Sequence, residues 1–175
     1  MKKIKSKFKD LFVIQTTVFK DKRGWLKEEF KKKFVNKNLV FTVVSKSRKN
    51  VLRGLHMQTK NPQDKFLSVV KGRILDVAVD LRKNSRTYGK HFKIILSERN
   101  GKHLFIPKGF AHGILALNKE NILHYACSNY RDPKSEVSIK WNDPDLKINW
   151  GTKKPIISKK DKFALPFKDF RENRK

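Results

Sequence analysis

The feature that most constrains the fold is a series of short apolar runs, each closed by turn residues, that continues along most of the chain. In the clearest run, residues 75–81, leucine and valine alternate with aspartate and alanine, which is the period of a half-buried β-strand. Comparable runs cover residues 12–19, 39–44, 51–58, 65–70, 90–96, 103–107, 111–117 and 121–128. The polar residues 45–50 are expected to form a turn. No long helical period is present, so the sequence predicts an all-β fold, an antiparallel sandwich or barrel.

The length of the chain, 175 residues, fits a single domain that spans residues 1–175. From Asp132 onward the sequence is polar and is expected to be loop-like. A single cysteine, Cys127, excludes an internal disulfide framework. No apolar run approaches the roughly 20 residues of a membrane-spanning helix, and the basic N-terminal segment lacks the apolar core of a signal peptide. We therefore expect a cytoplasmic protein.

The net charge is extreme: 43 Lys and Arg residues against 16 Asp and Glu residues give +27. Such a charge favours a polyanionic partner, either nucleic acid or an anionic membrane surface. The lysines are nevertheless spread over the whole chain, without an Arg-rich block or an aromatic–basic repeat. We expect nucleic acid to be attracted only non-specifically, and a nucleotide-bearing substrate would also be favoured by a positive field.

The segment VLRGLHMQ, residues 51–58, places a cation and a proton-transfer group on one expected strand. Arg53 suits the binding of an anion, and His56 suits the transfer of a proton near neutral pH. Strict alternation would put these side chains on opposite faces, because three positions separate them. Gly54, between them, is a position for a β-bulge that would bring both to one face. A lone histidine in a strand is more often a hydrogen-bonded structural residue, so this segment alone does not establish a site.

Two further strands carry polar groups on apolar faces. Alternation puts Lys65 on one face with Leu67 and Val69, where a lysine either extends to solvent at the end of the strand or serves a site. Alternation also directs Tyr125 into the barrel, on the less polar face of its strand. Taken alone, Tyr125 fits an ordinary core tyrosine.

The order of the motifs resembles that of the dTDP-4-dehydrorhamnose 3,5-epimerases, which are nucleotide-sugar epimerases on a cupin-type β jelly roll. The motifs are VLRGLHMQ, QDK, GRILDVAVDLRKNSRTYG, LFIPKGFAHGILAL and a tyrosine-bearing strand followed by WNDP, collinear over about residues 12–162. The resemblance implies an antiparallel jelly roll with short peripheral helices. It also implies proton exchange next to a ketone, which needs no metal and no redox cofactor. The product would serve rhamnose-type polysaccharide synthesis.

The resemblance implies four catalytic residues. His56 matches the base that removes a proton beside the 4-keto group, and Asp161 matches the carboxylate that orients this histidine. Lys65 matches the lysine that stabilises the enolate, and Tyr125 matches the acid on the opposite side of the sugar. A base, a cation near the developing oxyanion and an acid across the ring are what such a reaction requires.

The resemblance also implies substrate-binding residues. Arg53 matches an arginine for the diphosphate, which a forked guanidinium suits. His112 lies in the family's pocket with a supporting role, and Gln58 closes the RGLHMQ motif. Arg23 and Glu28 match residues that reach the nucleotide across a dimer interface, so a homodimer with shared sites is expected.

The chain departs from the family pattern at several positions. Phe41 and Val43 stand where a Gln and an Asn commonly contact the nucleotide. Ile114 replaces the aromatic residue after FAHG, and Tyr130-Arg131 replaces paired tyrosines. The nucleotide base therefore stays open, and a 3- or 5-epimerase that acts on another nucleotide-linked keto-deoxysugar is an alternative.

Two other classes compete with this interpretation. A metal-dependent cupin needs clustered ligands such as two His and a carboxylate, but Gln58 rather than a second His follows His56, and His103, His112 and His124 are scattered. We therefore expect no metal. A non-catalytic basic jelly-roll domain that binds a polyanion would explain the charge, but it would leave the four catalytic matches as coincidences.

Overall fold

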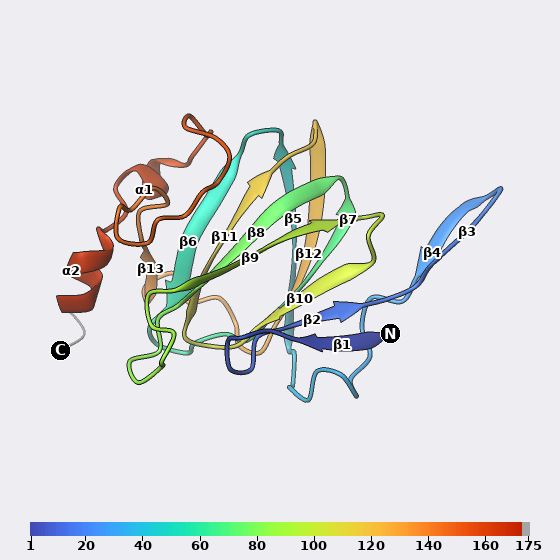
Figure 1. Cartoon of the computed structure of the whole chain (residues 1–175), viewed down its shortest axis with the longest axis horizontal. Coiled ribbons are helices and arrows are strands. Elements are labelled where there is room, and N and C mark those ends of the chain that lie inside the picture. Colours follow the sequence, from blue (N-terminus) through green and yellow to red (C-terminus); the bar gives the residue numbers. More distant parts are fainter. Residues whose placement is uncertain (173–175) are drawn as a thin grey trace.

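The structure of the chain, a computed structural model, describes residues 1–172, and two antiparallel β-sheets form its body (Figure 1). The six-stranded sheet is ordered β1 (Lys2–Lys5), β2 (Phe12–Gln15), β10 (Lys102–Ile106), β7 (Lys65–Lys71), β12 (Glu120–Cys127) and β5 (Phe41–Arg48). The five-stranded sheet is ordered β13 (Glu136–Ser138), β6 (Leu52–Gln58), β11 (Phe110–Ala116), β8 (Arg73–Asp80) and β9 (His91–Ser97).

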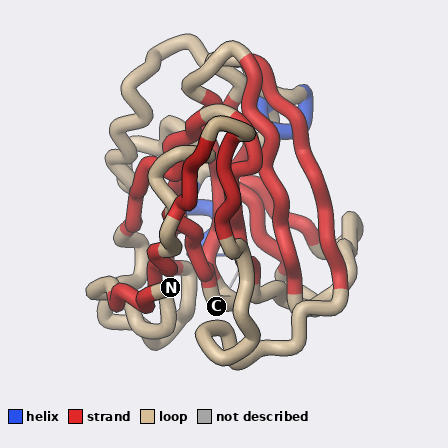
Figure 2. The backbone as a smooth tube through the Cα atoms, turned by 90° about the vertical axis from the view of Figure 1, so that its right-hand side faces the viewer, coloured by secondary structure: helices blue, strands red, loops and turns tan. Residues whose placement is uncertain are grey.

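From β5 onward the chain passes back and forth between the two sheets. The strands β5, β7, β10 and β12 belong to one sheet, and the strands β6, β8, β9, β11 and β13 belong to the other; of these strands, β8 and β9 are the one consecutive pair that stays in the same sheet. Strands dominate the backbone in Figure 2, and helices are short. The predicted all-β antiparallel jelly roll is confirmed.

A core of aliphatic side chains fills the space between the sheets. Leu67 and Val69 of β7 face Ile74 and Ala78 of β8, and Leu123 of β12 packs with them. These residues come from alternate positions of their strands, as the side-chain period of two requires. The other face of the six-stranded sheet is buried over β2, β10 and β7, under a cluster that includes Phe66, Phe105 and Val35.

The strand expected to be half-buried is in fact buried on both faces. Val77 and Val79 of β8 point outward, under the C-terminal segment. Asp76 and Asp80, on the alternate positions, have no exposed surface. The alternation was interpreted correctly as a strand, but the polar positions face the interior, where each carboxylate finds hydrogen-bond donors.

The C-terminal segment is more than a loop. It adds strand β13 to the edge of the five-stranded sheet and forms two helices, α1 (Lys159–Lys162) and α2 (Phe167–Glu172), on the side next to β6 and β13 (Figure 1). Trp150 and Phe167 pack on the outer face of this sheet, and the Trp150 indole donates to the carbonyl of Trp141 at 2.8 Å. The sequence did not predict this packing, because the large apolar residues of the segment are widely spaced among polar ones and form no periodic pattern.

Two predicted strand boundaries were wrong. The run 12–19 is divided into β2 and β3 (Val18–Asp21), because residue 16 bonds to Gly101 and the chain then leaves the sheet. The expected turn 45–50 is largely strand, since β5 continues to Arg48 and stays paired with β12 along its whole length. The first error came from residues 16 and 17, which interrupt an apparently continuous run, and the second from polar residues that occupy paired strand positions.

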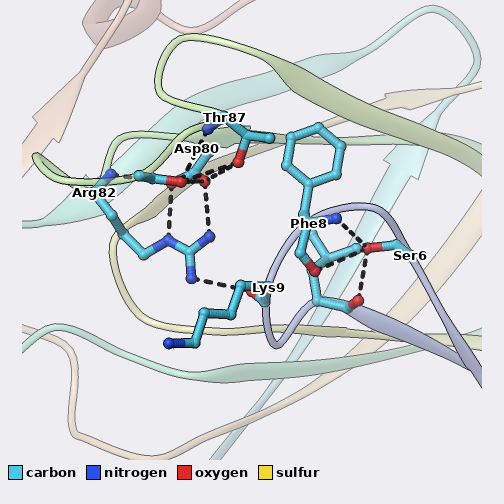
Figure 3. A network of polar contacts seen from close by, with 8 residues as sticks. Ser6, Phe8, Lys9, Asp80, Arg82 and Thr87 are labelled. Atoms are coloured by element: carbon cyan, nitrogen blue, oxygen red, sulfur yellow. Dashed lines mark hydrogen bonds and ion pairs between the residues drawn. The ribbon is translucent and has the colours of Figure 1, made fainter.

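A polar network fixes the end of β8 to the N-terminal loop (Figure 3). The Asp80 carboxylate accepts hydrogen bonds from Arg82 Nε at 2.9 Å, Ser85 Oγ at 2.6 Å and Thr87 Oγ1 at 2.6 Å. Arg82 Nη1 also donates to the carbonyl of Lys9 at 3.0 Å. Burial would raise the pKa of Asp80, but these bonds outweigh it and lower the pKa from 3.8 to about 2.

A two-stranded arm, β3 and β4 (Gly24–Lys27), extends away from the body (Figure 1). It exposes Phe19, Trp25 and Leu26, with relative exposures of 59%, 44% and 64%. Between residues 1 and 172, no helix has the length and apolar character needed to cross a bilayer.

Candidate active site

A cavity of about 660 Å³ lies between the two sheets and gathers most of the predicted site residues. It is lined from both sheets and from helix α1, and seven of the predicted residues contribute: Arg53, His56, Gln58, Lys65, His112, Tyr125 and Asp161. Phe41, Val43 and Ile114, the three apolar departures from the family pattern, form part of the same wall.

A β-bulge brings Arg53 and His56 to one face of β6. His112 of β11 stands opposite His56, and Ile114 stands opposite Arg53, so three steps on β6 match two steps on β11. The extra residue lies at Gly54, where φ is +119°. A Cβ at this position would lie 2.6 Å from the Cα of Gly113, so only glycine fits the close approach of the two strands. The bulge points both polar side chains into the cavity.

His56 is held by a buried carboxylate from the far end of the chain. Its Nε2 lies 2.6 Å from Oδ1 of Asp161, which is 3% exposed. Ser158 caps helix α1 and donates to the other carboxylate oxygen at 2.9 Å. Burial would raise the pKa of Asp161, but hydrogen bonds from His56, Ser158 and the Gly54 amide lower it below its usual value. Because an ionised carboxylate only accepts, Nε2 of His56 carries a proton, and in the neutral imidazole the lone pair is then on Nδ1.

Lys65 and Tyr125 come from the opposite sheet. Tyr125 of β12 pairs with Leu67 of β7, two positions from Lys65, so both side chains enter the same cavity. Burial raises the pKa of the Tyr125 phenol well above its usual value, which keeps it protonated. Burial lowers the pKa of Lys65, against the attraction of nearby groups that include Glu136 and Asp76. The cavity therefore has the imidazole of His56 on one wall and the amino group of Lys65 and the phenol of Tyr125 on the other.

His112 belongs to a second buried histidine–carboxylate pair. Its Nε2 lies 3.0 and 3.1 Å from the two oxygens of Asp76, and its ring stands edge-on to Tyr125 with centroids 6.2 Å apart. The sequence singled out His112 but not its partner Asp76. The pair orients His112 beside the phenol.

Glu136 is a cavity residue that the sequence did not reveal. Its Oε1 lies 3.7 Å from Nδ1 of His56 and 2.9 Å from the ammonium of Lys160, and its Oε2 lies 3.3 Å from Arg131. Burial would raise the pKa of Glu136, but Lys160, His56 and Arg131 lower it. Glu136 sits in a three-residue strand, which is too short to show a periodic pattern, so no local signal pointed to it.

The side chain of Gln58 forms hydrogen bonds with the backbone of two neighbouring loops. Its amide nitrogen donates to the carbonyls of Asn61 at 2.9 Å and Tyr130 at 3.3 Å, and its oxygen accepts from the amide of Asp132 at 2.9 Å. These three bonds join the loop that follows β6 to the loop that follows β12. Gln58 thus lines the cavity, and its side-chain amide is already hydrogen-bonded to backbone groups.

Arg23 and Glu28 lie outside the cavity of their own chain. Arg23 is on the arm and pairs with Asp21 at 2.6 Å, and Glu28 follows the arm and pairs with Lys31 at 2.7 Å. Neither residue lines the cavity.

Within the described 172 residues, no three His, Cys, Asp or Glu side chains are grouped so as to hold a metal ion. His103 and His124 lie on strands β10 and β12 of the six-stranded sheet, outside the cavity lining. Nδ1 of His124 lies 3.7 Å from Glu29.

Comparisons with known proteins agree with this geometry. A family model described as dTDP-4-dehydrorhamnose 3,5-epimerase matches residues 5–169. The enzyme of that name from Methanothermobacter thermautotrophicus is 42% identical over 174 residues, which cover 95% of this chain and 94% of the relative.

Two solved structures are similar over most of their length. The epimerase from Legionella pneumophila, in complex with dTDP-4-keto-L-rhamnose, has a TM-score of 0.88 and 37% identity over 93% of this chain and 90% of that one. The dTDP-4-dehydrorhamnose 3,5-epimerase from Bacillus anthracis, with TDP and PPi bound, has a TM-score of 0.90 and 35% identity over 95% and 99%. Sequence, fold and cavity thus agree that the chain belongs to the dTDP-4-dehydrorhamnose 3,5-epimerase family.

Proposed function

We propose that the protein epimerises carbons 3 and 5 of dTDP-4-dehydro-6-deoxyglucose to give dTDP-4-dehydro-L-rhamnose, without a cofactor. The observation that carries this proposal is the pair of opposed walls: His56, oriented by Asp161, faces Lys65 and Tyr125 across the cavity. Hydrogens on carbons 3 and 5 are acidic because both carbons flank the ketone at carbon 4. A base on one face and an acid on the other are sufficient to invert such a centre.

In the proposed first step, Nδ1 of His56 removes the proton from carbon 3 or 5. The imidazolium that forms still donates its Nε2 hydrogen bond to Asp161, and the negative charge of this carboxylate stabilises the new positive charge. Glu136, 3.7 Å from Nδ1, adds a second negative charge on the side where the proton arrives.

The electrons of the broken C–H bond move to the ketone oxygen and form an enolate. The ammonium of Lys65 is the proposed partner of this oxygen, because a cation in a partly desolvated cavity stabilises a developing oxyanion strongly. The phenol of Tyr125 then delivers a proton to the other face of the same carbon. Its raised pKa keeps the phenol protonated until the reactive enolate appears.

Binding of the nucleotide is proposed to rest on Arg53, with His112 in a supporting role. A guanidinium suits two phosphate oxygens, and the similar structures from L. pneumophila and B. anthracis hold a dTDP-sugar and TDP with PPi. Gln58 is proposed to shape the cavity through its bonds to the loops at residues 61 and 130–132.

We also propose a homodimer in which Arg23 and Glu28 enter the partner's site. Two observations support it. The arm exposes Phe19 and Leu26 far from the body, and β5 is an edge strand whose outer neighbour is missing in a single chain and whose Val44 is 65% exposed. An arm that docks on a second copy would cover both surfaces. Size-exclusion chromatography with light scattering tests this directly, and a monomer at micromolar concentration would exclude it.

Proton–deuterium exchange tests the reaction. The wild-type protein is mixed with dTDP-4-keto-6-deoxyglucose in deuterated water and followed by NMR. Deuterium at carbons 3 and 5 is the expected result. Exchange at one carbon would make the protein a single-position epimerase, and no exchange with this substrate would reject the proposed reaction for a thymidine nucleotide.

A further inference from the structure

The guanidinium of Arg53 is oriented by neutral groups of the neighbouring sheet. Its Nε donates to the hydroxyl of Ser47 at 3.0 Å, and its Nη2 donates to the carbonyl of Lys46 at 3.1 Å. Over residues 1–172, no carboxylate forms an ion pair with Arg53. Neutral anchors fix the direction of the side chain and leave its full positive charge for a ligand.

The two anchors also determine which part of the guanidinium stays available. An arginine carries five N–H donors in a rigid plane. Two of them are used by Ser47 and Lys46, so three remain, and they include both hydrogens on Nη1. The free edge, formed by Nη1 and the remaining hydrogen of Nη2, is able to make paired hydrogen bonds to two oxygens of a phosphate group.

Ser47 is itself held firmly. It is 3% exposed, and its carbonyl accepts from Nδ2 of Asn121 at 3.1 Å. Asn121 is fully buried, and its side chain also bonds to the backbone of Asn118 and Arg73. β5 is an edge strand, and among the described strands β12 is its one neighbour in the sheet. Because none of the others pairs with β5, the hydrogen bond from the Asn121 side chain adds a contact that holds Ser47 in place.

We propose that Ser47 is a positioning residue for substrate binding: its hydroxyl aims the Arg53 guanidinium at the diphosphate of the nucleotide sugar. This inference rests on the proposed function. A long arginine side chain loses rotamer freedom when it is fixed, and this loss opposes binding. The hydrogen bond from Arg53 to Ser47 fixes part of the arginine side chain before the ligand binds. Loss of the Ser47 hydroxyl should therefore weaken substrate binding and leave the proton-transfer groups unchanged.

The test uses the full chain and two measurements. Titration calorimetry with dTDP gives the dissociation constant, and the exchange reaction gives KM and kcat. We expect Ser47→Ala to weaken dTDP binding about fivefold, as for the loss of one hydrogen bond, and to raise KM similarly while kcat stays within about twofold. Ser47→Thr retains the hydroxyl and should restore both constants. Ser68→Ala is the matched control, because Ser68 is also a fully buried strand serine, but it lies outside the cavity.

A double-mutant cycle separates positioning from general stability. In an Arg53→Ala background, Ser47→Ala should have no further effect on dTDP binding, since the side chain that it orients is gone. An equal fivefold loss in both backgrounds, or no loss in the wild-type background, would overturn the proposal while leaving the epimerase function intact. A wild-type protein that neither binds dTDP nor exchanges deuterium would instead reject the proposed function, and the positioning role would fall with it.

Discussion

Asp161 Oδ1 lies 2.6 Å from His56 Nε2, although 105 positions of sequence separate the two residues. The contact joins β6 to helix α1, a four-residue helix whose N-cap, Ser158, also holds the carboxylate. The ionised carboxylate determines which histidine nitrogen carries the proton. The tautomer of His56, the proposed base, is therefore set by a residue in the C-terminal segment.

Replacement of His56 by Asn should nearly abolish exchange at both carbons. An amide has no lone pair of suitable basicity, and general base catalysis contributes about 100- to 10,000-fold. NMR in deuterated water measures the loss, and His124→Asn, on the opposite face of β12 from Tyr125, is the control. Exchange at the wild-type rate in the His56 variant would refute the proposed base.

Asp161→Asn should reduce kcat by about 100-fold or more while the fold is kept. The amide that replaces the carboxylate is able to donate to Nε2, which would move the histidine proton to Nδ1, where the lone pair is needed. Steady-state kinetics and a thermal melt measure the two effects. Wild-type kcat in this variant would show that the carboxylate has no part in setting the tautomer.

Tyr125→Phe should separate exchange from inversion. His56 would still remove the proton, and the enolate would be reprotonated from the same side, so deuterium would enter without a change of configuration. We expect net inversion to fall more than exchange does, and NMR detects both in one experiment. An equal fall in the two rates would assign Tyr125 to another step.

The sequence predicted most of the strands and seven of the residues that line the cavity, because apolar alternation and collinear motifs are local properties. It missed Glu136 and Asp76, whose neighbours in space come from other strands. It also predicted that the strand of Asp76 is half-buried, since periodicity tells which residues share a face but not whether the second face is covered. The outer face of the five-stranded sheet is buried by the C-terminal segment, whose large apolar residues are too widely spaced to form a pattern.

The bulge at Gly54 was predicted as one option because a glycine separates two polar residues on a strand. Gly54→Ala should destabilise the protein by about 3 kcal/mol and displace His56, since the new Cβ would lie 2.6 Å from the Gly113 Cα and from the carbonyl oxygen of His112. Gly151→Ala is the control: Gly151 also has a positive φ, +75°, but nothing lies within 4 Å of its Cβ position, so a loss of about 1 kcal/mol is expected. Urea unfolding compares them, and equal losses would contradict the close-approach argument.

Asp80→Asn should destabilise the protein by about 2 kcal/mol at pH 7, with a difference that shrinks in acid. The folded-state pKa of Asp80 is about 2, below its usual 3.8. A carboxylate with a lowered pKa stabilises the fold fully above the unfolded value, and this stabilisation is lost as the pH falls through the folded value. Each tenfold change in the proton affinity of the carboxylate corresponds to about 1.4 kcal/mol.

The stabilisation therefore disappears between about pH 4 and pH 2, where the wild-type and variant proteins should converge. Urea unfolding at about pH 7, 4, 3 and 2 measures this convergence, and Asp145→Asn, which removes an exposed carboxylate, controls for the change in net charge. A difference between wild type and Asp80→Asn that stays constant over this range would mean that hydrogen-bond geometry, rather than the carboxylate charge, holds β8 to the N-terminal loop.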